Sequence, residues 1–315
     1  MGEQHGANCG VAKVPDRGGQ GVAMSGRLTS QLGEESRREK GVAESRYSHG
    51  RTWNTKNLGL RSLSDVVAAA TAGVLVAPVV TTIDKAIIEN TSGRNTMRES
   101  IRSSLQTLLL RPHHFLSSRP FRLIFTLYSG TYLTANWLDT ASSTLHSTPA
   151  PTTTHGAPKF LATSAANLSL CLYKDAQFTQ LFASLHSAPR PVPLPSFALF
   201  SLRDCLTIFA SFNLPPLIAP HLPMHLAPAL EERVSRTSMA QFLAPAGIQV
   251  FSTPLHLLGL DHYNRPHASW RERLGKVGKE WGVSCLARMC RIVPAFGVGG
   301  VVNSGVRRHW MEKWE

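Results

Sequence analysis

The stretch FSTPLHLLGLDHYNRP, residues 251–266, places a proline inside a run that is otherwise apolar enough for a membrane helix. Pro254 has no N–H to bond the carbonyl four residues earlier, so a helix through this stretch bends there. In a lipid environment a neighbouring helix must then bond the freed carbonyl. The stretch therefore predicts a bent transmembrane helix packed against at least one other helix.

Five further stretches of the chain are also nearly free of charge. A helix needs about 20 apolar residues to cross a bilayer, and several stretches approach that length. They contain many Ser, Thr, Asn, Gly and Pro residues, which suits helices that face one another or a wet cavity. Together with the stretch that contains Pro254, they give six predicted segments: residues 66–83, 123–138, 160–173, 191–230, 237–260 and 292–306. Pro254 lies in the fifth segment, and Arg203 and Asp204 interrupt the fourth.

Basic residues between these segments are distributed unevenly. If the segments cross a membrane, successive loops alternate sides, and Lys and Arg favour one side. Loops after odd segments hold Lys85, Arg94, Arg98, Arg102, Arg111, Arg119, Lys174, Arg190, Arg265, Arg271, Arg273, Lys276, Lys279 and Arg288, whereas loops after even segments hold only Lys159, Arg233 and Arg236. A soluble helical bundle has no reason for this asymmetry, so we expect an all-α membrane protein.

The overall composition excludes several other classes. The 315 residues include 33 basic and 20 acidic side chains, a balance of +13 that favours an anionic partner. No basic run exceeds two residues, so we expect no nucleic acid. Five scattered cysteines without a CxxC pair predict neither disulfides nor a metal site. No paired carboxylates or nucleophile arrangement indicates an enzyme, and we expect no cofactor.

Two connectors divide the chain into units. TASSTLHSTPAPTTTHGAP (140–158) is rich in Ser, Thr and Pro, and PPLIAPHLPMHLAP (215–228) contains too much proline for a regular helix. Each unit between them holds two segments and a loop on the basic side. The predicted organisation is a disordered basic tail at 1–61, a first repeat at 62–140, a linker at 141–157, a second repeat at 158–225 and a third repeat at 226–312.

Three repeats of two segments with basic loops resemble the mitochondrial carrier family. The resemblance is carried by AAATAGVLVAPVVTTIDK (68–85), LFSLRDCLTIF (199–209), AQFLAPAGIQVFSTPLHLL (240–258) and LARMCRIVPAFGVGGVVNSGVRR (286–308), within about four-fifths of the chain. It implies six transmembrane helices in three pseudo-repeats around a central cavity, with alternating access. It also implies a mitochondrial membrane, the inner one favoured over the outer.

Charged signature residues of that family are mostly replaced here. Its odd helices carry a proline, an acid two residues later and a base three residues after that. Pro254 is followed by His256 at the acid position and Gly259 at the base position. After Pro78, both of these positions hold apolar residues. Asp175 fits an acid position without the proline. The resemblance therefore implies gate or bend positions at Pro78, Pro254, His256, Asp175, Asn303 and Arg307.

Three arginines are the candidate substrate ligands. Ionisable groups inside membrane segments are costly and so mark functional positions. Arg203 lies within the fourth segment, Arg291 precedes the sixth, and Arg122 stands at the entrance of the second, where an interfacial anchor is the alternative. Arg203 can equally pair with Asp204 to orient its helix.

These features predict a divergent carrier-like membrane protein that moves a small solute, with an anionic one favoured by the basic balance. We expect a monomer whose basic loops contact anionic lipid. A second hypothesis stays open because the charged gate residues are missing: a non-transporting carrier-like scaffold or organising factor, placed in the mitochondrial outer membrane.

Overall fold

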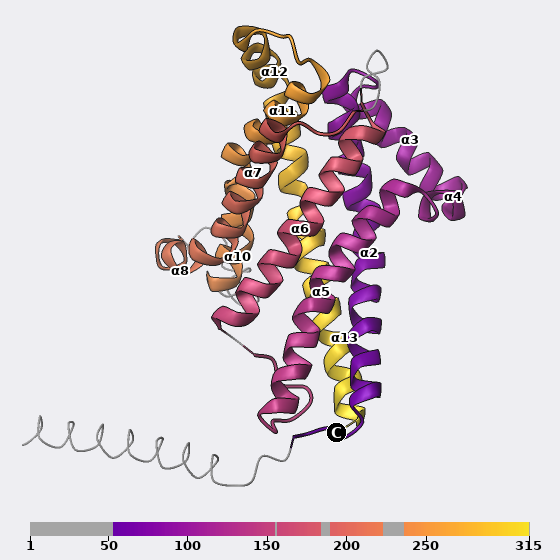
Figure 1. Cartoon of the computed structure of the whole chain (residues 1–315), viewed down its shortest axis with the longest axis vertical. Coiled ribbons are helices and arrows are strands. Elements are labelled where there is room, and N and C mark those ends of the chain that lie inside the picture. The colour runs from indigo at the N-terminus through magenta and orange to yellow at the C-terminus, as the bar shows by residue number, and fades with distance from the viewer. Residues whose placement is uncertain (1–52, 155, 184–189, 223–235, 315) are drawn as a thin grey trace, which may run out of the picture. The chain divides into compact units, whose positions relative to one another are not determined.

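The computed structural model describes residues 53–154, 156–183, 190–222 and 236–314 (Figure 1). Asn54–Glu315 form one compact unit, and every regular element within the described ranges is a helix. The all-α prediction is confirmed for these ranges. The predicted tail at 1–61 lies outside the described residues as far as residue 52, and so does the predicted boundary between the second and third repeats.

The first described helix, α2, is Leu58–Ser92. Its 35 residues are rich in Ala, Val and Ile, and at 1.5 Å per residue they extend about 52 Å. Pro78 lies inside it, as predicted for the first segment. The helix ends at Gly93, whose φ of 77° is the left-handed conformation that glycine adopts without strain, and its N–H bonds carbonyls of the last turn.

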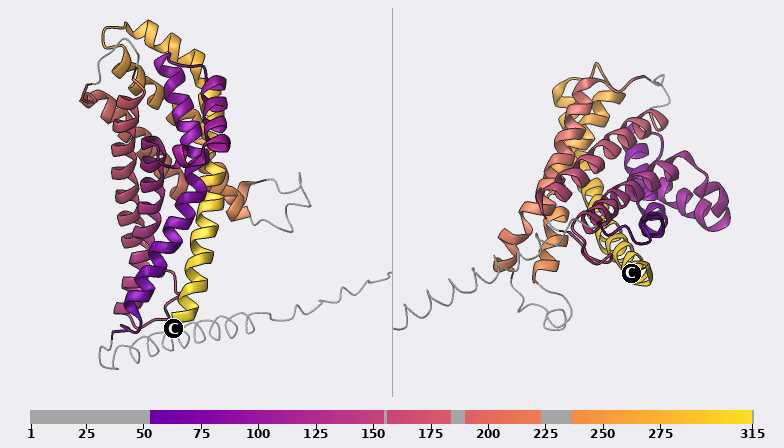
Figure 2. Two further views of the ribbon diagram at one scale, coloured as in Figure 1. Left: turned by 90° about the vertical axis from the view of Figure 1, so that its right-hand side faces the viewer. Right: turned by 60° about the horizontal axis from the view of Figure 1, so that its bottom comes forward.

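A short amphipathic helix follows beside α2. This helix, α3 (Met97–Leu110), begins at a capping box in which Thr96 and Glu99 bond each other's backbone N–H groups. The five-residue α4 (Pro112–Leu116) continues from it. Both lie at the side of the helical bundle, where α3 packs against α2 and α4 packs against α3 (Figures 1 and 2).

Three long helices form the middle of the chain. They are α5 (Arg119–Leu145), α6 (Ala157–Leu181) and α7 (Leu194–Asn213), each with a proline in its first turn, where the missing N–H costs nothing. The proline-dense connector after α7 forms only the single turns α8 (Pro215–Ile218) and η1 (Ala219–His221) in its described part. Longer regular helix is absent from that part, as predicted.

The opening stretch of the sequence forms α11 (Gln249–Asn264), which follows α10 (Arg236–Gly247) almost without interruption. Pro254 lies inside α11 and leaves the carbonyl of Val250 without its helical donor. The indole Nε1 of Trp281, in α12 (Trp270–Cys290), donates to that carbonyl at 3.0 Å. The predicted bond from a neighbouring helix is therefore present.

The last part of the chain is nearly continuous helix. It comprises α12 (Trp270–Cys290), the π-helical turn η3 (Val293–Val298) that contains Pro294, and α13 (Gly299–Trp314). A basic loop was predicted between the fifth and sixth segments, but most of this stretch is helical. A capping box between Ser269 and Glu272 starts a helix there instead.

The long helices pack side by side (Figure 2). α2 packs against α5 and α13, α5 against α6, α6 against α7, α7 against α11, and α11 against α12. Gly299 allows close approach, because a Cβ there would overlap Tyr132 of α5 and Val76 of α2. Gly300, the next residue, has open space around it.

The bundle buries charged side chains beside an apolar core and exposes large apolar side chains. Arg61, Arg203 and Arg288 are among the largest fully buried side chains, whereas Val74, Leu75 and Val79 on α2 are about half exposed. Exposed apolar side chains on a long helix, together with buried paired charges, suit a lipid environment. Within the described ranges, three stretches are long and apolar enough to cross a membrane: Leu58–Ser92, Met239–Asn264 and Trp270–Trp314. The chain is a multi-pass membrane protein.

Candidate functional site

A cluster of buried ionic side chains lies inside the bundle. Three carboxylates, Asp84, Asp175 and Asp204, meet three cations, Lys174, Arg203 and Arg291. We call these six residues the central cluster. They come from α2, α6, α7 and the residue after α12, so four segments far apart in sequence contribute to one network.

Asp84 connects the first part of the chain with the last. One carboxylate oxygen accepts from Nη1 of Arg291 at 2.5 Å, and the other accepts from Nζ of Lys174 at 3.0 Å. Asp84 is 5% exposed, so these pairs lie in a low-dielectric interior. Breaking such a pair leaves an uncompensated charge, which makes Asp84 the structural link between α2, α6 and the end of α12.

Arg203 extends the cluster from α6 to α11. Its Nη2 lies 2.5 Å from Asp175 and 2.6 Å from Asp204. Its Nη1 donates to Nδ1 of His256 at 3.0 Å, since a guanidinium has no acceptor. The His256 ring also packs on Phe200, with ring centroids 5.4 Å apart. The pairing of Arg203 with Asp204 is therefore present, whereas contact of Arg203 with a substrate stays a prediction.

The central cluster is not fully satisfied. Nε of Arg203 and Oδ2 of Asp204 are buried and have no hydrogen-bond partner among the described residues. Most buried polar groups in folded proteins are bonded, so an unpaired donor and acceptor on neighbouring residues need an explanation. A polar ligand with both a donor and an acceptor is one such explanation.

A second polar layer joins α2, α5 and α13. Arg307 donates to Asp65 at 2.8 Å and to Thr140 at 3.2 Å. Asn136 and Asn303 bond each other reciprocally, both at 2.9 Å. We call these five residues the terminal layer. It places the predicted Asn303 and Arg307 together.

The two layers lie far apart along α2. Asp65 and Asp84 are both in this helix, 19 positions apart, which corresponds to about 28 Å. That separation is close to the thickness of a bilayer core. Between the layers the helices pack closely: Tyr132 donates to the carbonyl of Ala295 at 2.6 Å, and Val76 is fully buried.

The sequence-predicted residues fall into three groups. Arg203, Asp175, His256 and Arg291 meet in or at the central cluster, while Asn303 and Arg307 meet in the terminal layer. Pro78 and Pro254 are half-buried within their helices. Arg122 is exposed at the start of α5, and its side chain has no bond to a described residue, so it stands apart from both layers.

Charged pairs are present in the interior, but at other positions than those of the carrier signature. Asp84 lies six residues after Pro78, not two, and its partners Lys174 and Arg291 are 90 and 207 residues away. Asp65 likewise gives Arg307 an acidic partner. Sequence reasoning also missed Arg288, which is buried beside Gln249. Charged residues within apolar segments could be recognised in the sequence. Which of them pair could not be predicted, because pairing depends on the rotation of each helix about its axis.

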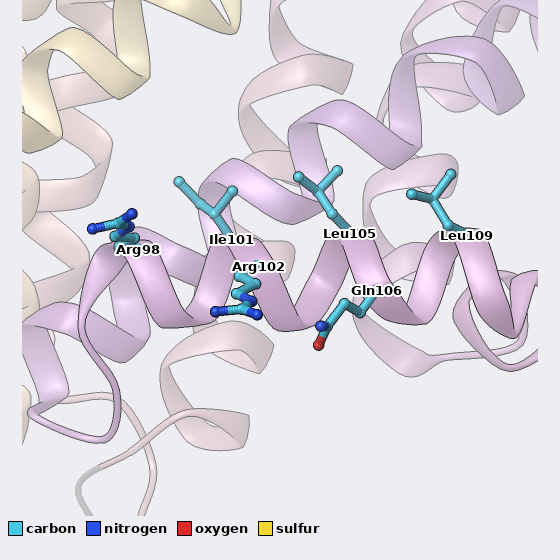
Figure 3. A pocket seen from close by; sticks show the side chains of 6 residues that line it. All are labelled: Arg98, Ile101, Arg102, Leu105, Gln106 and Leu109. Atoms are coloured by element: carbon cyan, nitrogen blue, oxygen red, sulfur yellow. The ribbon is translucent and has the colours of Figure 1, made fainter.

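A shallow groove lies on the outside of the molecule, away from both layers. Arg98, Ile101, Arg102, Leu105, Gln106 and Leu109 line it along one face of α3 (Figure 3). Arg98 and Arg102 are exposed and make no bond to a described residue. The face combines basic groups with exposed leucines, which is typical of a helix at a membrane surface.

No three His, Cys, Asp or Glu side chains come together as metal ligands in the described ranges. Among known families, the model of a family described as a probable citrulline exporter matches residues 68–311, about three quarters of the chain. No curated protein and no solved structure matches the chain significantly.

The resemblance to mitochondrial carriers is therefore wrong. The family that matches across α2 to α13 is a different one. Pairs of apolar helices with prolines and basic connections are a property of many membrane bundles, and the charged residues that define carriers are absent from their positions here.

Proposed function

Because the chain belongs to the family of probable citrulline exporters, we propose that it carries a citrulline-like amino acid out of a membrane-bound compartment, through the interior of the helical bundle. Citrulline is a zwitterion with a neutral ureido end. Its ammonium and carboxylate groups need opposite charges close together, and its ureido group needs both donors and acceptors.

The observation that carries this proposal is the central cluster. Its carboxylates suit an ammonium group, and its guanidinium groups suit a carboxylate. A zwitterion can therefore replace ion pairs within the protein by ion pairs with the ligand, and the net charge of the site does not change. The buried Nε of Arg203 and Oδ2 of Asp204, which have no partner in the described part of the chain, offer one donor and one acceptor. Such exchange of partners is what a transport site requires, because binding must be reversible.

We propose six membrane-crossing segments: α2, α5, α6, α7, α10 with α11, and η3 with α13. Three of these lie in the stretches that are apolar and long enough by composition. The other three, α5, α6 and α7, have 27, 25 and 20 residues, a length that suits a bilayer. Their polar residues would face the shared interior, arranged as three pairs around a central path.

Two polar layers about 28 Å apart along α2 favour alternating access. In this proposal the central cluster closes one end of the path and the terminal layer closes the other. Each layer is held by ion pairs or amide bonds from several helices, so either can separate while the other stays closed.

Anionic phospholipid is the partner that we propose for the α3 groove. Arg98 and Arg102 would contact headgroup phosphates, while Leu105 and Leu109 contact acyl chains. A mitochondrial location, with the inner membrane favoured, stays a prediction. Localisation of a tagged chain with organelle markers tests it.

The function is tested by reconstituting the full chain into liposomes loaded with radiolabelled citrulline. We expect release of citrulline that exceeds leak from protein-free liposomes and saturates with concentration. The D84N variant should transport poorly, because Lys174 and Arg291 lose their shared partner. A folded protein without citrulline release would contradict the proposal and favour the non-transporting scaffold.

A further inference from the structure

Arg288 is a buried cation without a carboxylate partner among the described residues. Its side chain is 2% exposed, and its one hydrogen bond runs from Nε to Oε1 of Gln249 at 2.9 Å. It makes no ion pair with a described residue. The six charges of the central cluster balance one another, so the Arg288 charge is additional to that balance.

The surroundings of Arg288 are polar and equally buried. Gln249, Ser252 and Thr253 share one face of α11 at i, i+3 and i+4 spacing, and all are fully buried. Ser252 donates to the same Gln249 oxygen that Arg288 contacts. The hydroxyl groups of Thr253 and of Ser284, one turn before Arg288 on α12, have no partner in the described part of the chain.

A purely structural role does not account for this arrangement. The end of a helix offers a cation only a partial negative charge, and α12 passes almost directly into η3. A buried guanidinium with no carboxylate is costly unless an anion joins it for part of the working cycle. Arg291, one turn later on the same helical face, already bonds Asp84, so this face of α12 looks toward the interior.

We infer that Arg288 binds the α-carboxylate of the transported amino acid, with Gln249 holding the guanidinium in place and the Ser284 and Thr253 hydroxyls as additional donors. This inference rests on the proposed function. It adds a ligand class: the substrate must carry a carboxylate, and amino acids stripped of that charge are poor substrates. Charge-assisted bonds from a desolvated guanidinium supply the discrimination.

The test compares citrulline with its α-carboxamide, which has nearly the same size but no carboxylate. Both are loaded into liposomes that contain the full chain. Wild type should export citrulline at least about tenfold more efficiently than the carboxamide, a ratio that corresponds to one charge-assisted interaction. In R288Q, citrulline export should fall about tenfold or more while carboxamide export stays near its wild-type value, so that the preference disappears.

Retained carboxamide export shows that R288Q is folded, and R288K should keep part of the preference because it keeps the charge. R122Q is the matched control, since Arg122 is an exposed arginine apart from both layers. R288Q with the full wild-type preference would overturn the inference, and so would equal loss of both fluxes in R288Q and R288L. A wild-type chain that exports no citrulline overturns the proposed function itself, together with this inference.

Discussion

The indole N–H of Trp281 in α12 donates at 3.0 Å to the backbone carbonyl of Val250 in α11, the carbonyl that Pro254 deprives of its helical donor. One side chain thus compensates a proline on another helix. In lipid the compensation matters more than in water, because no solvent can bond the carbonyl instead.

Replacing Trp281 by Phe should destabilise the protein by about 0.5–1.5 kcal/mol, the net contribution of a typical hydrogen bond, because this bond lies at an exposed position. P254A restores an N–H to α11, so the same W281F change should cost clearly less in that background. Thermal unfolding in detergent of the four proteins of this double-mutant cycle measures the coupling. Equal cost of W281F in both backgrounds would show that the indole contributes through packing alone.

Asp84 holds two cations, so its removal should be among the most damaging single changes in the interior. D84N leaves Lys174 and Arg291 without their shared carboxylate, and we expect a loss of about 3–5 kcal/mol in unfolding free energy, measured by denaturant titration in detergent. Adding R291Q to D84N removes one unpaired charge and should recover part of the loss. A further decrease on adding R291Q would contradict the pairing of Arg291 with Asp84.

The basic face of α3 predicts a response to lipid charge. Adding phosphatidylglycerol to detergent-solubilised protein should raise its unfolding temperature, whereas phosphatidylcholine should not. R98Q/R102Q should weaken the stabilisation by about 2 kcal/mol, at about 1 kcal/mol per basic residue near an anionic surface. R98K/R102K keeps both charges and should respond as wild type does. An unchanged response in the glutamine variant would exclude this face as the lipid contact.

Local rules predicted much of the fold. Charge-free stretches marked most of the long helices, and the absence of an N–H at Pro254 was enough to predict an extra bond from a neighbouring helix. The helix ends extended further than hydropathy indicated: α2 reaches Ser92, although the apolar run stops at residue 83. An apolar segment predicted from hydropathy ends at the first charged residue. The helix itself continues through backbone hydrogen bonds until a residue such as Gly93 ends it.

Partner assignment in the candidate site could not be predicted in the same way. Asp175, Arg203 and His256 were recognisable as unusual because they are polar residues in apolar segments. Their bonds, however, depend on the rotation of α6, α7 and α11 about their axes, and one residue corresponds to about 100° of that rotation. The missed role of Asp84 follows from this uncertainty in register, whereas Arg122 lies at the start of α5, at the entrance where it was predicted.

The reciprocal amide pair of Asn136 and Asn303 joins α5 to α13 in the terminal layer and gives a direct test of alternating access. If this end of the path must open during export, a short cross-link between the two positions should stop citrulline release. In a background with the native cysteines replaced, N136C/N303C treated with a short bifunctional methanethiosulfonate should lose at least about 90% of its flux, and a reductant should restore it, since opening of one layer is obligatory in such a cycle. The single-cysteine variants receive the same reagent and should keep their flux, which separates cross-linking from modification. Full release from a cross-linked protein would show that the terminal layer is a fixed structural contact and that the path for the solute lies elsewhere in the bundle.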